Sequence, residues 1–408
     1  MAISANELNN SQEGVLSSKG KLTLSNAAVD NRDGVIVADQ HLILAGTSLD
    51  NRGGLVSGKA DVSVDVNALF DNSGQGTLLS DGKLTVNAAE LRNGDRGQVA
   101  AKDDLAITVD SLSQQGAASS QAGELLSQGK LTLEAQRIDN RQGGLIAATK
   151  GLEIHASELL RNGGGEISTQ GTAKIRVLAA AGQPTALLDN SHAGLIIGDQ
   201  GLTLTVQRLL NHTKGVLSGR DSLVLTGGSL DNSSGGTLSS QQALNVQLTG
   251  ALANQSQGAL VSGSSLTVGA GSLDNSAGGL ISSAGILNVS GDSLNNQGGK
   301  LVSDGPLSIA NKALNNSNGG VISTKQSLSV GTDQLDNQHG GVINSGAGLT
   351  VTAGQINNHN QGLIAAKGVT HITASGLDQH QGGELLSESA LTLNLQGGAL
   401  NNSGQGLI

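Results

Sequence analysis

The chain has 408 residues, a formal net charge of −10, 61 Gly, one Phe and no Tyr, Trp or Cys. The lack of Cys excludes thiol chemistry and cysteine-based metal sites, and the acidic balance leaves no basic footprint for nucleic acid. No apolar run approaches the length of a transmembrane segment. Because only 14% of the residues are charged, we expect an exterior of Ser, Thr, Asn, Gln and Gly.

An apolar residue, which we call the marker, precedes a short Asp/Asn-rich pair and recurs along the whole chain, from Leu8 to Leu400. It occurs about 19 times at intervals of roughly 20 to 23 residues, apart from two longer intervals. A fixed period of this size indicates a repeat architecture rather than the two or three globular domains that the length alone suggests. We therefore predict a single repeat array over residues 1–408. Because the pattern enters and leaves in mid-repeat, we expect the array to be a fragment of a longer one.

The two longer intervals predict surface loops. They lie between Leu112 and Ile138 and between Leu160 and Leu188, and the additional residues fall near 113–123 and 178–187. Insertions that leave the period intact on both sides protrude from one repeat. Each is either a tolerated insertion or a contact loop for a partner.

Each repeat contains three short apolar runs. In one part of the chain these are a Leu-x-Val run at 266–268, the marker Leu273 and the pair Leu280-Ile281. Leu-x-Val alternates as a strand does, and Gly, Asn, Asp and Ser between the runs favour turns. A Gly five or six residues after nearly every marker supplies positive φ or close backbone approach, and it disfavours helical repeats.

These features predict an all-β, right-handed parallel β-helix, with about 19 coils of roughly 21 residues and three short strands per coil. The handedness follows from the strong preference of parallel crossovers. One coil of about twenty residues buries too little apolar surface to offset its conformational entropy, so stability must be collective.

A row of Asn is predicted at the second residue after the marker, where side-chain amides can hydrogen-bond from coil to coil. We interpret this row as structural, with Gln114, His212 and Gln379 as exceptions that keep some donor and acceptor capacity. The row comprises Asn10, Asn31, Asn51, Asn72, Asn93, Asn140, Asn162, Asn190, Asn232, Asn254, Asn275, Asn296, Asn316, Asn337, Asn358 and Asn402.

Two patterns of charged residues are candidate sites. Asp30, Asp50 and Asp71 align in adjacent coils, but Asp recurs at this position along the chain, which favours a turn rule over a catalytic carboxylate cluster. Arg32 and Arg52 stack beside them and predict a solvated ion-pair strip. The enzyme hypothesis therefore has no candidate catalytic residue, and we predict no cofactor.

Two other rows were weighed in the same way. His339, His359 and His380 follow the marker in successive coils, where a metal or pH-sensitive patch competes with ordinary turn variation, and we predict no metal. A Thr row in the Leu-x-Val runs is broken at Glu153 and elsewhere, so it is read as an ordinary outward strand position.

The repeats "LDNRGGLVSG" (49–58), "IDNRQGGLIAA" (138–148) and "LDNSAGGLISS" (273–283), each linked to "LTV"-like strands, resemble filamentous haemagglutinin repeats. The resemblance covers essentially the whole chain. It implies a β-helical shaft in a large exoprotein of bacterial two-partner secretion, which is exported unfolded through a dedicated outer-membrane β-barrel transporter. It also implies a secreted or cell-surface location and a role in adhesion, virulence or contact-dependent growth inhibition.

The sequence thus supports a rigid filamentous stalk segment that presents an adhesive or toxin module to a target cell. The alternative is a binding module, in which the array or its loops contact a receptor, glycan or membrane. A third and weaker hypothesis is a β-helical enzyme that acts on polysaccharides.

Overall fold

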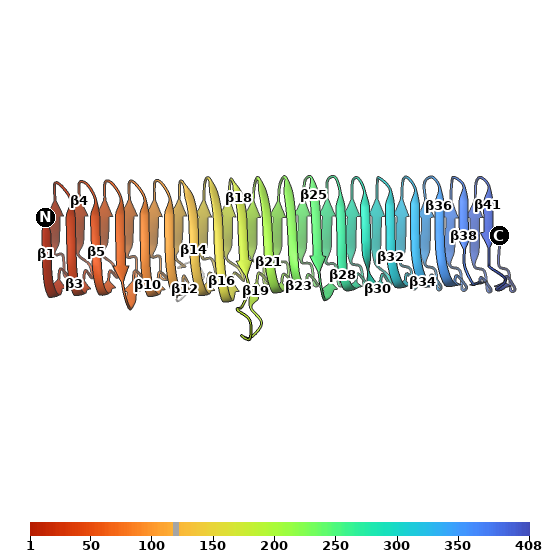
Figure 1. Cartoon of the computed structure of the whole chain (residues 1–408), viewed down its shortest axis with the longest axis horizontal. Coiled ribbons are helices and arrows are strands. Elements are labelled where there is room, and N and C mark those ends of the chain that lie inside the picture. The colour runs from red at the N-terminus through yellow and green to blue at the C-terminus, as the bar shows by residue number, and fades with distance from the viewer. Residues whose placement is uncertain (117–121) are drawn as a thin grey trace. The chain divides into compact units, whose positions relative to one another are not determined.

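The computed structural model describes residues 1–116 and 122–408. The chain divides into two compact units, residues 1–209 and residues 210–408, and each is described by itself. In the described residues all regular structure is β-strand, without any helix (Figure 1).

Each unit contains a sheet of long strands and a sheet of short strands. In residues 1–209 the long-strand sheet comprises β1 (Ala2–Asn9), β3 (Leu22–Asp30), β5 (Leu42–Asp50), β7 (Val62–Val66), β8 (Leu69–Asp71), β10 (Leu84–Arg92), β12 (Leu105–Ser113), β14 (Lys130–Asp139), β16 (Gly151–Arg161), β18 (Thr172–Val177), β19 (Leu187–Asp189) and β21 (Gly201–Leu210). The short-strand sheet comprises β2 (Val15–Ser18), β4 (Val35–Ala38), β6 (Leu55–Gly58), β9 (Thr77–Ser80), β11 (Gln98–Ala101), β13 (Glu124–Ser127), β15 (Leu145–Ala148), β17 (Glu166–Thr169) and β20 (Leu195–Gly198).

The second unit repeats this arrangement. Its long-strand sheet comprises β23 (Ser222–Asp231), β25 (Ala243–Leu248), β26 (Ala251–Ala253), β28 (Leu266–Asp274), β30 (Leu287–Asn295), β32 (Leu307–Asn315), β34 (Leu328–Asp336), β36 (Leu349–Asn357), β38 (Thr370–Thr373), β39 (Gly376–Asp378), β41 (Leu391–Asn394) and β42 (Ala399–Asn401). Its short-strand sheet comprises β22 (Val216–Gly219), β24 (Thr237–Ser240), β27 (Ala259–Ser262), β29 (Leu280–Ser283), β31 (Lys300–Ser303), β33 (Val321–Thr324), β35 (Val342–Ser345), β37 (Leu363–Ala366) and β40 (Glu384–Ser387).

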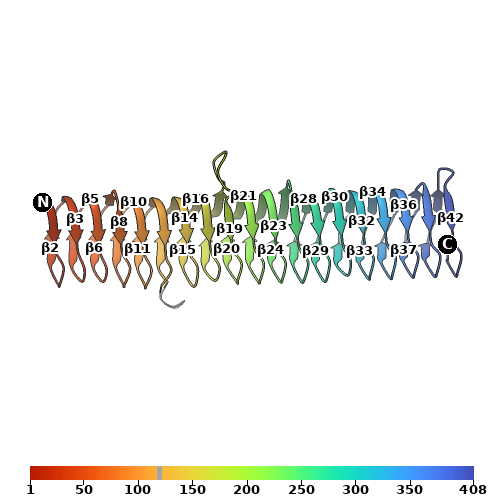
Figure 2. The ribbon, with the colours of Figure 1, turned by 90° about the horizontal axis from the view of Figure 1, so that it is seen from below.

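Successive coils pair in parallel and in register. Leu22 of β3 faces Leu42 of β5, and Val15 of β2 faces Val35 of β4. Figure 2 shows the short strands side by side within each unit, with the long strands above them in this view. This is a parallel β-solenoid of about 19 turns with a repeat of about 21 residues, which confirms the predicted fold class.

The three predicted runs of a coil are all present, but two of them are usually joined. The Leu-x-Val run and the marker run lie in one nine-residue strand in β3 and β5, because backbone pairing continues through the bend between them. In β7 and β8 they separate. Val62 and Phe70 are eight residues apart, whereas the equivalent residues Leu42 and Leu49 are seven apart, and the additional residue interrupts the strand.

The core is made of columns of aliphatic side chains, one per strand position. Leu22, Leu24, Val29 and Ile36 of one coil are all at most 2% exposed, and their partners in the next coils are buried in the same way. Full burial of each such side chain contributes roughly 1.5–3 kcal/mol. Outward side chains alternate with them along every strand.

The recurring Gly is required by close backbone approach and not by its φ angle. A Cβ placed on Gly34 would lie 2.0 Å from the backbone oxygen of Asn10 in the preceding coil, and φ at Gly34 is not positive. The left-handed position is one residue earlier, where Asp33 has φ 55° and the equivalent Gly53 has φ 66°. Thus the tight corner itself tolerates several residue types, whereas the residue that follows must lack a side chain.

Candidate functional surfaces

The predicted Asn row lies at the corner between the long and short strands. The members from Asn31 to Asn358 are 0% exposed, and Asn10 in the first coil is partly exposed. Within each unit, the side-chain amide nitrogen of one member donates to the side-chain oxygen of the next member. For example, Nδ2 of Asn31 lies 2.7 Å from Oδ1 of Asn51, and also 3.2 Å from the backbone oxygens of Gly34 and Leu55.

Within each unit these bonds all run in the same direction. The first unit contains the ladder Asn10, Asn31, Asn51, Asn72, Asn93, Gln114, Asn140, Asn162 and Asn190. The second contains Asn211, Asn232, Asn254, Asn275, Asn296, Asn316, Asn337, Asn358 and Gln379. Aligned amides polarise one another and satisfy buried groups that would otherwise be costly.

Two positions of the row differ from the sequence interpretation. Asn211, and not His212, occupies the row, because Leu209 is the buried marker and Leu210 lies one position beyond it. The assignment of His212 to the row was therefore wrong; its Nδ1 atom lies 2.7 Å from Oγ1 of Thr213 at the surface. Asn402 is exposed, and Gln379 donates to the backbone oxygen of Leu407 instead.

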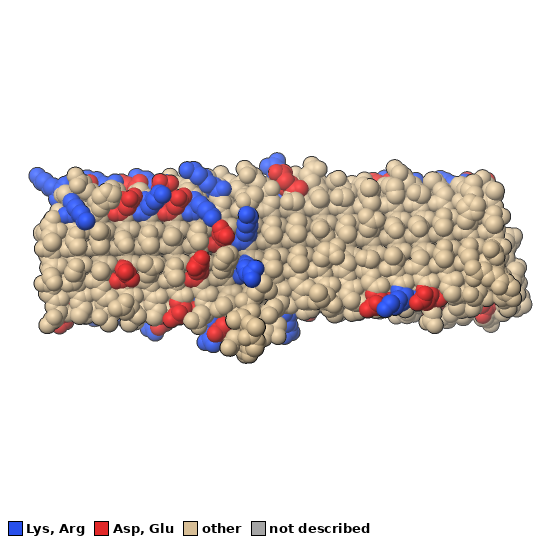
Figure 3. All heavy atoms as spheres, in the orientation of Figure 1, with Lys and Arg blue, Asp and Glu red and all other residues tan. Residues whose placement is uncertain are grey.

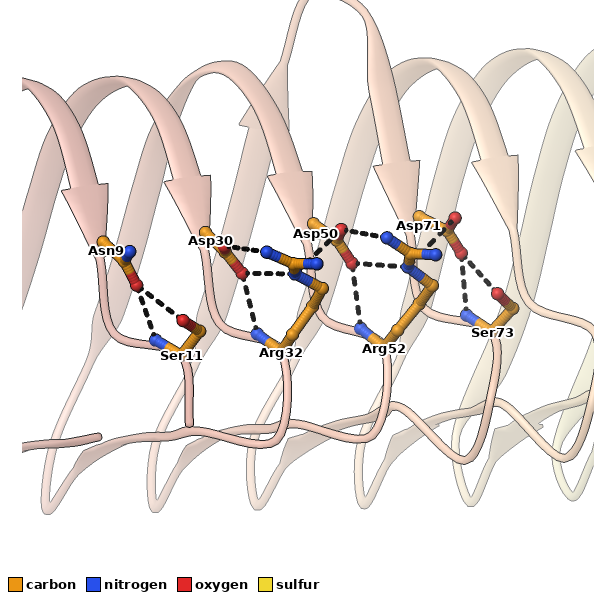
Figure 4. Close-up of polar contacts among 8 residues, drawn as sticks. All are labelled: Asn9, Ser11, Asp30, Arg32, Asp50, Arg52, Asp71 and Ser73. Atoms are coloured by element: carbon orange, nitrogen blue, oxygen red, sulfur yellow. Dashed lines mark hydrogen bonds and ion pairs between the residues drawn. The ribbon is translucent and has the colours of Figure 1, made fainter. Parts of the chain in front are cut away.

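The Asp column lies directly before the Asn row and closes the turn. Oδ1 of Asp30 accepts the backbone N–H of Arg32 at 3.1 Å, and Oδ1 of Asn9 accepts that of Ser11 at the same position of the preceding coil (Figure 4). The carboxylate also accepts from Nε of Arg32 at 3.0 Å. The hydrogen bond from this guanidinium is the main reason why the pKa of Asp30 lies below its ordinary value.

The Arg side chains link neighbouring members of the Asp column. Arg32 lies between Asp30 and Asp50, at 2.7 and 3.6 Å, and Arg52 lies between Asp50 and Asp71, at 2.6 and 3.8 Å (Figure 4). The Arg side chains are about half exposed, which is the setting of a surface ion-pair strip. These carboxylates are engaged in turn closure and ion pairs, so the column offers no free acid–base pair.

The three His of successive coils lie together at one turn. The rings of His359 and His380 stack with centroids 4.6 Å apart, and His339 meets His359 edge-on at 6.1 Å. Nδ1 of His380 lies 2.5 Å from Oδ1 of Asp378. Burial of this carboxyl acts to raise its pKa, but the hydrogen bond from His380 opposes that, and the pKa of Asp378 lies below its ordinary value.

Over residues 1–116 and 122–408, no group of three or more His, Asp or Glu side chains is arranged to hold a metal ion. Within the same ranges no helix is long and apolar enough to cross a membrane.

One of the two predicted loops is described. Residues 178–186 leave the end of β18 and return at β19, and Oε1 of Gln207 accepts the backbone N–H groups of Ala179 and Ala186 at 3.1 and 2.6 Å. Gln207 thus fixes both ends of the loop. In the other predicted loop, at 113–123, residues 117–121 lie outside the described residues.

The model of the haemagglutinin-repeat family matches eight overlapping segments, at residues 2–74, 55–135, 116–177, 172–247, 235–311, 287–337, 302–358 and 327–404. These segments cover nearly the whole chain. The chain belongs to the haemagglutinin-repeat family. Neither the comparison with curated proteins nor the comparison with solved structures returns a match.

One group of charged residues in the first unit departs from the regular pattern of the outward positions. The outward positions of the long strands mostly carry small or uncharged residues, but in three successive coils they carry Glu134, Glu153, His155, Lys174 and Arg176. We call these five residues the charged patch. Figure 3 shows charged side chains near the middle of this face, in addition to those along the upper left edge and at the lower right.

The charged patch was missed by the sequence interpretation. Pairing places Glu134, His155 and Arg176 in one column, and Glu153 and Lys174 in the neighbouring column. The sequence does contain a signal for the charged patch, because Glu153 interrupts the Thr row. However, a change at one position of each of three repeats becomes a cluster only after the repeats are aligned coil by coil.

Proposed function

We propose that this chain is a rigid stalk segment of a large secreted bacterial exoprotein, and that the stalk presents an adhesive or toxin module to a target cell. Haemagglutinin repeats folded as a β-solenoid fit a filamentous adhesin stalk. The observation that carries the proposal is the unidirectional side-chain ladder, which links successive coils from Asn10 to Asn190 in the first unit and from Asn211 to Gln379 in the second.

Rigidity follows from the way in which the coils are joined. Each coil is hydrogen-bonded to its neighbour through two sheets and through the Asn row, so bending at one coil would break all three. Nearest-neighbour coupling of this kind gives repeat proteins stability that is shared along the array. A stalk needs this stiffness, and it needs no catalytic group.

Family membership also guides the proposed route to the cell surface. Haemagglutinin repeats are typical of secreted or surface-exposed proteins. We take the export partner to be an outer-membrane two-partner secretion transporter, which passes the chain unfolded. The chain contains no Cys, so it can fold outside the cell without forming a disulfide.

A deletion of whole coils in the native exoprotein tests the stalk function. Removal of residues 275–336 takes out three coils, joins Asp274 to Asn337 in register and shortens the stalk by roughly 14 Å. We expect the exoprotein to remain displayed and active in attachment or in inhibition of target cells. Removal of residues 275–305, about one and a half coils, breaks the register and is expected to abolish display.

The same experiment separates the stalk from the alternative, a solenoid that itself binds a receptor, glycan or membrane. If the three-coil deletion were displayed and folded but no longer attached to cells, the stalk function would be wrong for this segment. The family and the fold favour a structural adhesin over an enzyme. The Asp column, which is engaged in turns and ion pairs, gives no support to polysaccharide cleavage.

A further inference from the structure

We propose that Asn318, in the turn after β32, is a site of spontaneous deamidation, which converts its side-chain amide into a carboxylate. The sequence contains three Asn-Gly pairs, at Asn93, Asn162 and Asn318. Such pairs favour this reaction because Gly has no side chain to hinder the attack of its backbone nitrogen on the preceding amide. The modification goes beyond the stalk function, since it changes the charge of an exposed turn after the chain has folded.

Two of the three amides are held in the buried ladder. Asn93 and Asn162 are both 0% exposed. Nδ2 of Asn93 donates to Oε1 of Gln114 at 2.9 Å, and Nδ2 of Asn162 donates to Oδ1 of Asn190 at 2.8 Å. Attack on either amide requires these bonds to break and the corner of the coil to open, so the fold protects both residues.

The amide of Asn318 has no such restraint. Asn318 lies two residues after the ladder member Asn316 and is exposed, as is Gly319. Among the described residues, no hydrogen bond holds its side-chain amide. The attacking atom is the backbone nitrogen of Gly319, which donates to the backbone oxygen of His339 at 3.1 Å. An exposed turn opens far more readily than the core, so the two reacting groups can meet while the coils stay folded.

A turn two coils further on is matched to this one but lacks the Gly. Asn360 has φ 52°, against 54° at Asn318, and is followed by Gln361 in place of Gly319. Gln361 has φ 65° and Gly319 has φ 76°, so the two turns share one backbone conformation. The side chain of Gln361 hinders attack by its own backbone nitrogen. Asn318 therefore combines an exposed amide with a following Gly, whereas Asn162 and Asn360 each have one of these two features.

The reaction consumes only water. The backbone nitrogen of Gly319 bonds to Cγ of Asn318 and loses its proton to the solvent, while the Cγ–Nδ2 bond breaks and the leaving nitrogen takes up a proton to depart as ammonia. The product is a five-membered succinimide ring. Water then opens the ring at one of its two carbonyl carbons. Opening at Cγ gives Asp, and opening at the backbone carbonyl gives isoaspartate.

Both products add a negative charge to the turn at neutral pH. Asp95 occupies the equivalent turn position in the first unit, with φ 49°, so the Asp product fits the turn without rearrangement. Isoaspartate lengthens the main chain by one methylene group and moves the N–H of Gly319 away from the oxygen of His339. The turn is therefore preserved in the first product and loosened in the second.

The test is peptide mapping by mass spectrometry of the full chain after incubation at pH 8. Trypsin releases residues 313–325 and 162–174, and fragment ions show which Asn has become an acid. We expect conversion of Asn318 to be at least about tenfold faster than that of Asn93 or Asn162, because one additional hydrogen bond to be broken already gives this factor. Conversion should also be faster than at Asn360. In denaturant, where the ladder is lost, the three Asn-Gly pairs should convert at similar rates.

A substitution separates the effect of Gly319 from that of the surroundings. Gly319→Gln copies the pair Asn360-Gln361, has open space around it, and should remove the excess conversion at Asn318. The matched control is Gly340→Gln, the same change in the turn of the next coil, where His339 precedes the Gly. This control should leave conversion of Asn318 as it is in the original chain.

Three results would overturn the inference. In the folded chain, Asn318 could convert no faster than Asn162, or no faster than Asn360. Conversion of Asn318 could also be unchanged in Gly319→Gln. If that variant does not fold, the rates of Asn318, Asn162 and Asn360 within the original chain still test the proposal, since all three are measured in one sample.

Discussion

Nδ2 of Asn296 donates to Oδ1 of Asn316 in the next coil, at 2.7 Å, while Oδ1 of Asn296 accepts from Asn275 at 2.8 Å. The same side chain therefore serves as donor to one neighbour and acceptor from the other. It also lies 3.3 and 3.2 Å from two backbone oxygens, those of Gly299 and Val321. Asn is the smallest side chain that carries two N–H donors beside an acceptor oxygen, which explains why it recurs when most other letters change.

Removal of one amide should destabilise the second unit more than removal of an exposed amide from the same repeat. Asn296→Ala leaves buried Oδ1 of Asn316 without its donor and removes one of the acceptors of Nδ2 of Asn275, so we expect a loss of about 2–5 kcal/mol in the free energy of unfolding. Asn288→Ala, at an exposed outward position of β30, should change it by less than about 0.5 kcal/mol. Denaturant unfolding measures both, and similar losses would argue against the ladder as a source of stability.

Two adjacent glycines in this turn should differ sharply in their response to substitution. A Cβ on Gly299 would lie 1.9 Å from the backbone oxygen of Asn275, so Gly299→Ala forces neighbouring coils apart and should cost more than about 3 kcal/mol. Gly298 has φ +63° but open space around it, and Asp33 adopts the same conformation. Gly298→Asn should therefore cost about 1 kcal/mol or less. Thermal unfolding measures the loss of stability in each variant, and equal losses would contradict the close-approach explanation.

The fold could be predicted from the sequence because the period, the alternating apolar runs and the turn residues all indicate the same β-helical coil. The sequence allows two explanations for the recurring Gly, a positive φ angle or a close approach of the neighbouring backbone. Only the coil-to-coil distance at residues such as Gly34 decides between them. The joining of two runs into one strand in β3 was also beyond the sequence pattern, since it depends on backbone pairing through a bend.

Features of the surface were harder to predict from the sequence than features of the core. Leu209 and Leu210 are adjacent apolar residues, and either could be the marker. The sequence pattern alone gives no reason to choose Leu209, and the choice of Leu210 left Asn211 out of the predicted row. The charged patch depends on which residues of three coils share a column, and that requires the register of β14, β16 and β18.

The turn ion pairs should make the first unit less stable in acid. Because the pKa of Asp30 is lowered in the folded chain, its contribution is present above the ordinary Asp pKa of about 3.9 and is lost as the pH falls through the folded value. Asp30→Asn keeps an acceptor for the N–H of Arg32, as Asn9 does for Ser11 in the preceding coil, but it removes the charge.

We therefore expect Asp30→Asn to lower the free energy of unfolding at pH 7 by less than about 1 kcal/mol, since Arg32 is half exposed, and to have a smaller effect at pH 2. Denaturant unfolding at the two pH values measures this. Asp65→Asn removes an exposed carboxylate that has no ion pair in the described residues, and it serves as the control. A loss of the same size at both pH values would contradict an electrostatic origin.

The loop 178–186 should be released by a single substitution at its base. Oε1 of Gln207 is the acceptor for the N–H groups of both Ala179 and Ala186, so Gln207→Ala leaves the two ends of the loop without that restraint. We expect faster hydrogen exchange over residues 178–187, about tenfold for a lost hydrogen bond of about 1.4 kcal/mol, with little change in global stability because the side chain faces outward from the core. Gln207→Glu retains an acceptor oxygen at the same place and should restore slow exchange. If exchange were unchanged in Gln207→Ala, or equally fast in Gln207→Glu, the loop would be held by its own backbone and not by Gln207.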